Sequence, residues 1–264
     1  MNELRIPMDP LNPGHFYACC GLLELMEPAH SWLESRFEVV ARVPRRAEFL
    51  VRSKDPIDLK AALKLIRSAE YKAQIVGGGE DESVAILPMA VIWPGRELWL
   101  DWWLNEFHDK ATSLKGWGGQ MTSQSLFDEL PQYIDEDLDP KGLFVSARAV
   151  SSRFGVDPRS SWKTLDLGYS LNEQGQDALT YPAVEMLAAF GLQRFRPAER
   201  NRDRVNYALW SEWLHLSVAG LAANQPWEGL EVRPYEFKIA KRGQGYKYFT
   251  FGTPSRNQNL EETE

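Results

Sequence analysis

Cysteine and histidine are scarce in this chain of 264 residues. The two cysteines, Cys19 and Cys20, are adjacent and cannot form the disulfide framework of a small secreted domain. A structural zinc needs about four ligands, and the scattered histidines and paired cysteines lack that spacing. The sequence therefore predicts no disulfide, no metal site and no cofactor.

Long apolar runs are also lacking. No uninterrupted apolar stretch approaches the roughly 20 residues that cross a bilayer, so we expect no membrane contact. Residues 1–7 contain no basic region followed by an apolar stretch, so export is not indicated and we expect a cytoplasmic protein. The chain is 44% hydrophobic and 25% charged, a globular composition that argues against a disordered scaffold.

Charge is unevenly distributed along the chain. The net charge is −7, which by itself argues against a nucleic-acid binder. Residues 70–139 contain fourteen acidic and four basic residues, whereas residues 191–250 contain ten basic and six acidic residues. A basic face directed to phosphate, with an acidic face elsewhere, is compatible with this pattern.

Apolar spacing and turn residues predict a mixture of helices and strands. Helices are expected at 15–26, 56–68, 122–130, 182–190 and 214–223, with Gly191 ending the fourth. Strands are expected at 36–43, 47–52, 84–87, 142–150, 206–210, 231–240 and 246–251, with 93–104 extended. Because the elements do not alternate regularly, we predict an α+β fold with mainly antiparallel sheets.

Two lobes are a possible organisation. The acidic connector 135–139 is the best boundary, giving an N-terminal α+β lobe over 1–134, a C-terminal lobe over 140–254 and an acidic tail over 255–264. A single domain remains the alternative.

The C-terminal hairpin is the first candidate for nucleic-acid binding. Its turn carries Lys241, Arg242 and Lys247, and Tyr246 follows the glycines. Cations suit phosphates and aromatic rings suit bases. The alternative is a solvated hairpin whose alternate aromatic residues pack inward.

A second candidate is a stretch with five arginines in eleven positions: Arg194, Arg196, Arg200, Arg202 and Arg204. The planar guanidinium group suits phosphate or guanine. A local ion-pair loop with Glu199 and Asp203 is the alternative.

The third candidate is the loop 115–120, in which Lys115 and Gln120 flank Trp117 and three glycines. Small residues allow backbone amides to approach a ligand. A tight turn with Trp117 anchored in the core is an equally good interpretation.

Catalytic groupings are weak. His15, near a glycine, is the only histidine in a suggestive setting for acid or base chemistry, and a histidine there more often caps or packs. Cys19 and Cys20 lie in an apolar stretch and are expected to be buried thiols. The acidic loop 80–82 lacks histidine support, so a two-metal nuclease is poorly supported.

Several segments together resemble one bacterial family. They are DPLNPGHFYACCGLLE at 9–24, LKGWGGQ at 114–120, RFGVDP at 153–158, LDLG at 165–168, YPAVE at 181–185 and GLQRFRP at 191–197. In this order the chain is similar to the subtype-specific CRISPR-associated family of type I-G operons, formerly called type I-U.

The resemblance implies a component or accessory of a crRNA-guided, Cascade-like interference complex in antiviral defence. The expected partners are crRNA or target DNA and the other effector subunits, and no catalytic residue is carried over. In such complexes guide pairing supplies sequence discrimination while protein subunits hold the backbone. The enzyme-class alternative is a metal-independent, guide-RNA-processing ribonuclease using His15. A protein-only adaptor using Trp99, Trp102 and Trp103 is the third possibility, although such residues more often lie in a core.

Overall fold

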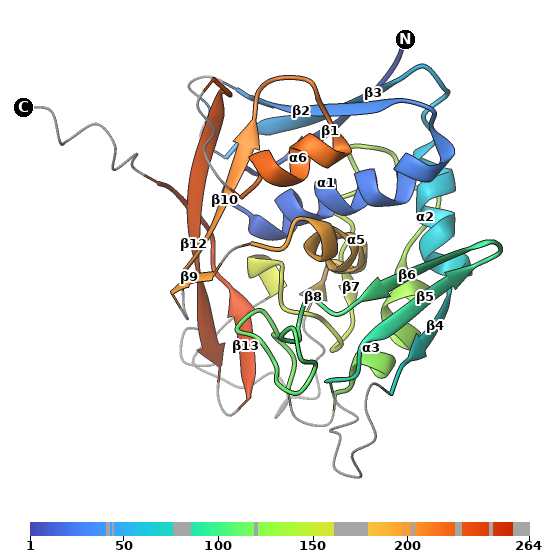
Figure 1. Ribbon diagram of the computed structural model, residues 1–264, viewed down its shortest axis with the longest axis vertical. Helices are drawn as coiled ribbons and strands as arrows, with labels where there is room; N and C mark the ends of the chain where they lie inside the picture. The colour runs from blue at the N-terminus through green and yellow to red at the C-terminus, as the bar shows by residue number, and fades with distance from the viewer. Residues whose placement is uncertain are drawn as a thin grey trace, which may run out of the picture.

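The computed structural model describes residues 1–40, 43, 45–75, 86–118, 121–160, 179–197, 199–201, 204–224, 229–242 and 245–255. The fold is α+β, with helices packed against several antiparallel sheets, as predicted (Figure 1). The helices are α1 (Pro13–Met26), α2 (Leu59–Ser68), α3 (Ser123–Glu129), α5 (Pro182–Arg194) and α6 (Leu216–Ala222), with 3-10 turns at Glu27–Ala29, Leu130–Tyr133 and Pro158–Ser160. The strands are β1 (Asn2–Met8), β2 (Leu33–Val39), β3 (Ala47–Ser53), β4 (Glu70–Ala73), β5 (Met89–Trp93), β6 (Arg96–Leu100), β7 (Arg148–Ala149), β8 (Leu179–Thr180), β9 (Glu199–Asn201), β10 (Arg204–Trp210), β11 (Leu214–His215), β12 (Val232–Arg242), β13 (Tyr246–Phe249) and β14 (Thr253–Pro254).

Helices α1 and α5 lie side by side at the centre of the molecule (Figure 1). A methyl group added at Gly21 would lie 1.8 Å from the carbonyl oxygen of Leu187, and one at Gly191 would lie 2.0 Å from that of Tyr17. The two backbones are therefore in direct contact. The prediction that Gly191 ends the helix is wrong, because α5 continues to Arg194. Gly191 instead allows the backbone of α1 to approach closely, since it has no side chain.

The first sheet has the strand order β1-β3-β2-β11. The predicted strands 36–43 and 47–52 correspond to β2 and β3, which pair antiparallel with Phe37 opposite Phe49. Alternate residues of β2 point to opposite faces, so Leu33, Ser35 and Phe37 are buried while the residues between them lie on the outer face.

The second sheet has the order β13-β12-β10-β9, and β14 also pairs with β12. Its inner face carries Tyr207, Phe237 and Phe249, whose rings contact Tyr17 of α1. The predicted C-terminal hairpin is confirmed as β12 and β13, with Ile239 opposite Phe249.

A third sheet, β4-β5-β6, continues into an aromatic cluster beside α3. Trp102, Trp103 and Trp117 pack edge to face, and Phe127 of α3 and Phe154 complete the cluster. Aromatic pairs in this geometry add stability beyond their buried area. This cluster fixes the loop that contains Trp117.

The two expected lobes share one hydrophobic core. Helix α1 comes from the first half of the chain and α5 from the second, and β11 joins the first sheet through Leu214 opposite Ser35. Within the connector 135–139, Asp137 pairs with Lys60 of α2.

Two predicted elements differ from the structure. Residues 142–150 form turns followed by the short strand β7, because amides of Gly142 and Leu143 bond back to the carbonyl of Asp139. Helix α2 begins at Leu59 rather than at 56, since the side chain of Asp58 caps it by accepting from the amide of Ala61. Of the predicted strand 84–87, residues 84 and 85 lie outside the described residues, and Ile86 and Leu87 do not belong to a strand. The tail beyond residue 255 also lies outside the described residues.

Within the described segments, none of the helices combines the length and the apolar character that a bilayer crossing requires.

Candidate nucleic-acid interface

The later part of the arginine-rich stretch belongs to the same sheet as the basic hairpin. Arg200 lies on β9, Arg204 begins β10, and Lys241 and Arg242 end β12. Lys247 lies on β13, and these four strands are neighbours in the second sheet (Figure 1). Segments about 40 residues apart are thus joined by strand pairing, as the binding hypothesis requires.

The strand register sorts the hairpin residues onto two faces. Phe237 and Ile239 of β12 are buried, so Lys238 between them lies on the opposite face. Arg204 of β10 is opposite Lys238. We call the face formed by Arg204, Lys238, Tyr246 and Tyr248 the outer face of the second sheet.

Tyr246 and Tyr248 lie on the outer face of β13, opposite to the face that carries the buried Phe249. The side chain of Tyr246 is 37% exposed, and Tyr248 is half-buried opposite Ala240. Lys238 and Tyr248 were not among the predicted site residues. The alternation of apolar and polar residues along 235–240 is the sequence pattern that identifies the position of Lys238.

At the tip of the hairpin, Lys241 is opposite Lys247 on the face that continues the core. The backbone amide of Lys247 donates to the carbonyl of Gly116 at 2.8 Å. Its Nζ donates to the carbonyl of Thr112 at 3.4 Å. The loop around Gly116, one of the three predicted candidates, therefore lies directly against the basic hairpin.

The glycines of this loop are explained by chain packing. A methyl group at Gly118 would lie 2.5 Å from the carbonyl oxygen of Gly245, and one at Gly116 would lie 2.0 Å from that of Phe154. Trp117, only 1% exposed, anchors the loop in the aromatic cluster. The close approaches are to the backbone of loop 153–157 at Gly116 and of the hairpin at Gly118, which matches the tight-turn interpretation.

Lys115 lies half-buried at the base of the hairpin. Its Nζ donates to the carbonyl of Trp117 at 2.8 Å and lies 5.1 Å from the centre of the Trp117 ring. Burial, together with the nearby charge of Lys247, lowers the pKa of Lys115. An added anion would relieve the repulsion between these two cations. Gln120 lies outside the described residues.

The arginines with described side chains are already engaged. Arg194 of α5 donates to the carboxylate of Glu24 of α1 at 2.5 and 3.1 Å. Arg204 pairs with Glu236 at 2.9 Å. The ion-pair alternative therefore holds for these two residues.

Arg196 contacts the same part of the chain as Lys247. It donates to the carbonyl of Leu104 at 2.5 Å. Leu104 forms a bridge with Ala111, the neighbour of Thr112, which accepts from Lys247. Arg196 and Lys247 thus contact the same turn.

Three of the predicted cations cannot be placed as side chains. Arg202 lies outside the described residues, and for Arg200 and Arg242 the description is limited to their strand positions.

His15 is buried at the start of α1. Its Nδ1 accepts from the amide of Asp9 at 3.0 Å, and its ring stacks on Phe144. Burial lowers the pKa of His15 to about 3, so the ring is neutral near pH 7. An acid or base in RNA cleavage must reach the scissile phosphate, whereas this ring is 5% exposed. Cys19 and Cys20 are fully buried, and burial raises the pKa of both thiols.

Next to His15, three of the segments that carry the family resemblance meet in a buried polar network. Glu185 accepts from the amides of Phe154 and Gly155 at 2.8 and 3.0 Å. Asp157 accepts from Asn12 at 3.1 Å and pairs with Arg159. Burial and the charge of Asp157 raise the pKa of Glu185 to about 7. This network fixes loop 153–157, on which the glycine loop and hairpin rest.

Of the tryptophans proposed for an adaptor surface, Trp102 and Trp103 are fully buried in the aromatic cluster. Trp99 is 43% exposed and donates to Glu97 at 2.7 Å.

Among the described residues no group of histidine, cysteine, aspartate and glutamate is arranged to hold a metal ion. Comparison of the chain with protein-family models, curated proteins and solved structures finds no match. The function is therefore argued from the site itself.

Proposed function

We propose that this chain is a non-catalytic nucleic-acid-binding subunit of a type I-G CRISPR interference complex, and that it holds crRNA or target DNA on the outer face and tip of the second sheet. The observation that carries the proposal is the contact between the basic hairpin and the loop of Lys115, which gathers Lys115, Lys241 and Lys247 at the tip of the hairpin that also carries the exposed Tyr246.

The chemistry of this region suits a single strand. Exposed tyrosines on a sheet provide surfaces on which bases stack, and neighbouring cations follow the phosphates. Lys238 is exposed and forms no ion pair with another described residue. A cation without a carboxylate partner can neutralise a phosphate without first losing a bond within the protein.

The wider assignment rests on the sequence resemblance. In a guide-dependent complex the paired strands supply sequence discrimination, so the subunit needs contacts to the backbone and no base code. The acidic residues of segment 70–139, part of which contacts the hairpin through the loop of Lys115, suit contact with a basic neighbouring subunit. The proposal places the protein in the cytoplasm.

Salt dependence tests the interface. Fluorescence anisotropy with a labelled single-stranded RNA gives the affinity of the full chain at several salt concentrations. If Lys238 and Lys241 each neutralise one phosphate, the double variant Lys238→Ala/Lys241→Ala lowers the slope of log affinity against log salt by about 1.4. The control is Lys64→Ala on α2, an exposed lysine outside the second sheet, which leaves the slope unchanged. An unchanged slope in the double variant removes the hairpin from the interface and refutes the proposal.

Co-purification separates the nucleic-acid role from a protein-only adaptor. We expect association with the other operon products to weaken after nuclease treatment. Association that survives nuclease, from protein that binds no RNA in the anisotropy assay, favours the adaptor.

A further inference from the structure

The first sheet has two edges that differ in how they are protected. At the β1 edge, Pro7 lacks the amide proton that an added strand would need. At the β2 edge, the short strand β11 pairs only with Ser35 and Glu34. Within the described part of the chain, no strand covers β2 beyond that point.

Hydrogen bonding identifies the β2 residues that face this open edge. The carbonyl of Ser35 accepts from Trp210 on the β11 side, whereas the amide of Val40 donates to Arg46 on the β3 side. Because backbone groups alternate in direction along a strand, the amide and carbonyl of Phe37 and Val39 face the open edge.

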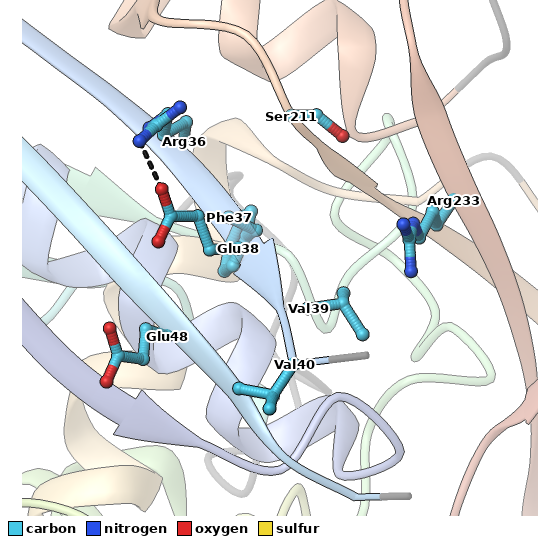
Figure 2. A pocket seen from close by; sticks show the side chains of 8 residues that line it. All are labelled: Arg36, Phe37, Glu38, Val39, Val40, Glu48, Ser211 and Arg233. Carbon is cyan, nitrogen blue, oxygen red and sulfur yellow. Dashed lines mark hydrogen bonds and ion pairs between the residues drawn. The ribbon is translucent and has the colours of Figure 1, made fainter. Parts of the chain in front are cut away.

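A groove of about 340 Å³ lies along this open edge. We call it the edge groove. Its near wall is β2 from Arg36 to Val40, and its far wall carries Ser211 and Arg233 (Figure 2). The groove thus combines an unpaired strand edge with a facing wall of polar side chains.

The polar groups of the edge groove favour an acidic occupant. Arg233 forms no hydrogen bond or ion pair with another described residue, and Nε of Arg36 is buried without a partner there. Glu38 and Glu48, by contrast, are paired with Arg36 and Arg5. The unmet groups are donors, which a carboxylate would satisfy.

We infer that the edge groove binds an extended segment of a partner protein as an additional strand on β2, with an aspartate or glutamate of that segment paired with Arg233. Main-chain bonds to Phe37 and Val39 supply affinity, and the arginine supplies selectivity. The inference is independent of nucleic-acid binding on the second sheet.

The test uses a fluorescein-labelled peptide of alternating valine and threonine with one central aspartate, and a matched peptide with lysine at the centre. We expect the full chain to bind the aspartate peptide about tenfold more tightly than the lysine peptide, as a charge-assisted hydrogen bond provides. Arg233→Glu, a change at an exposed side chain, reverses the preference.

Two proline variants test the strand pairing. Val39→Pro removes a donor from the open edge and abolishes binding of the aspartate peptide. Glu3→Pro makes the same change on β1, where Pro7 four residues on, an even spacing, indicates that the amide of Glu3 faces outward, and it leaves binding intact. Circular dichroism establishes that each variant is folded, and Arg233→Glu remains decisive if Val39→Pro is not. Equal affinity for both peptides, no binding of either up to about 1 mM, binding unaffected by Arg233→Glu, or self-association through this edge overturns the inference.

Discussion

The outer faces of the two large sheets both carry basic residues, but these residues differ in whether they are paired with nearby carboxylates. On the first sheet Arg5 pairs with Glu3 at 2.7 Å and Arg52 with Glu34 at 2.6 Å, and Arg52 also lies 4.3 Å from the ring centre of Trp213. On the second sheet, Lys238 has no carboxylate partner among the described residues and shares the outer face with the exposed Tyr246. The number of cations does not distinguish the faces. The second sheet differs in offering Lys238 without a carboxylate partner, although its Arg204 is paired with Glu236, and this makes it the face better suited to a polyanion.

The largest expected effect comes from displacing the hairpin. Gly118→Val places side-chain atoms where a methyl group already lies 2.5 Å from the carbonyl oxygen of Gly245. We expect a loss of about 1–3 kcal/mol in unfolding free energy, the usual cost of overpacking, and loss of measurable RNA binding. Urea unfolding and anisotropy measure the two effects.

The control for that variant is Gly220→Ala in α6, where the nearest atom to an added methyl group is 3.9 Å away. It is expected to be neutral or stabilising. Full RNA affinity in Gly118→Val would show that the contact between loop and hairpin is irrelevant to binding.

The pH dependence of stability tests the account of the buried residue His15, which lies in the core and not at the proposed interface. The folded-state pKa of His15, about 3, is below its ordinary value of 6.5, so its contribution to stability is complete above pH 6.5 and is lost as the pH falls toward 3. Relative to His15→Gln, the wild type should lose up to about 1.4 kcal/mol per pH unit in that interval, measured by urea unfolding.

Glu185 is expected to change the stability with pH in the opposite direction to His15. Its folded-state pKa is raised to about 7, so its contribution is complete below 4.5 and is lost as the pH rises through 7. Glu185→Gln therefore serves as the opposite control. RNA cleavage that disappears in His15→Gln would instead restore the ribonuclease hypothesis.

Tyr246 tests stacking on the second sheet. Removing one base–aromatic stack costs about 1–3 kcal/mol, so Tyr246→Ala should weaken RNA binding about tenfold, while Tyr246→Phe keeps the ring and most of the affinity. Trp213→Ala, the matched loss of an aromatic residue on the first sheet, should leave RNA affinity unchanged. An equal loss for Tyr246→Ala and Trp213→Ala would abolish the distinction between the faces.

The smallest expected effect comes from freeing one arginine on each face. Glu236→Gln releases Arg204 on the second sheet and should raise RNA affinity about two- to threefold, the scale of an exposed ion pair. Glu34→Gln releases Arg52 on the first sheet and should have no effect. The dissociation constants of the Glu236→Gln and Glu34→Gln variants for RNA, measured at low salt, test this difference between the two faces.

Local patterns in the sequence were sufficient for much of the fold. The spacing of apolar residues over 15–26 predicted α1, and alternation over 235–240 predicted the hairpin strand of Phe237. These features depend on neighbours in sequence. The turns at 142–146 did not follow, because bonds to the carbonyl of Asp139 outweighed the strand-like composition.

Contacts between distant residues could not be read from the sequence. Arg194 is 170 residues from Glu24, and nothing local indicates that they pair. Gly191 has the appearance of a helix stop until Tyr17 is placed against it. The candidate segments are visibly basic in the sequence, but only the backbone hydrogen bond from Lys247 to Gly116 shows that the loop of Lys115 meets the hairpin.

Crosslinking locates the bound strand on one sheet or the other. Ultraviolet irradiation of the full chain with a 4-thiouridine-containing RNA, followed by peptide mass spectrometry, should place crosslinks in residues 238–248, with Tyr246 and Tyr248 foremost. Crosslinks confined to β1, β2 and β3 would contradict the assignment of the second sheet as the nucleic-acid-binding face.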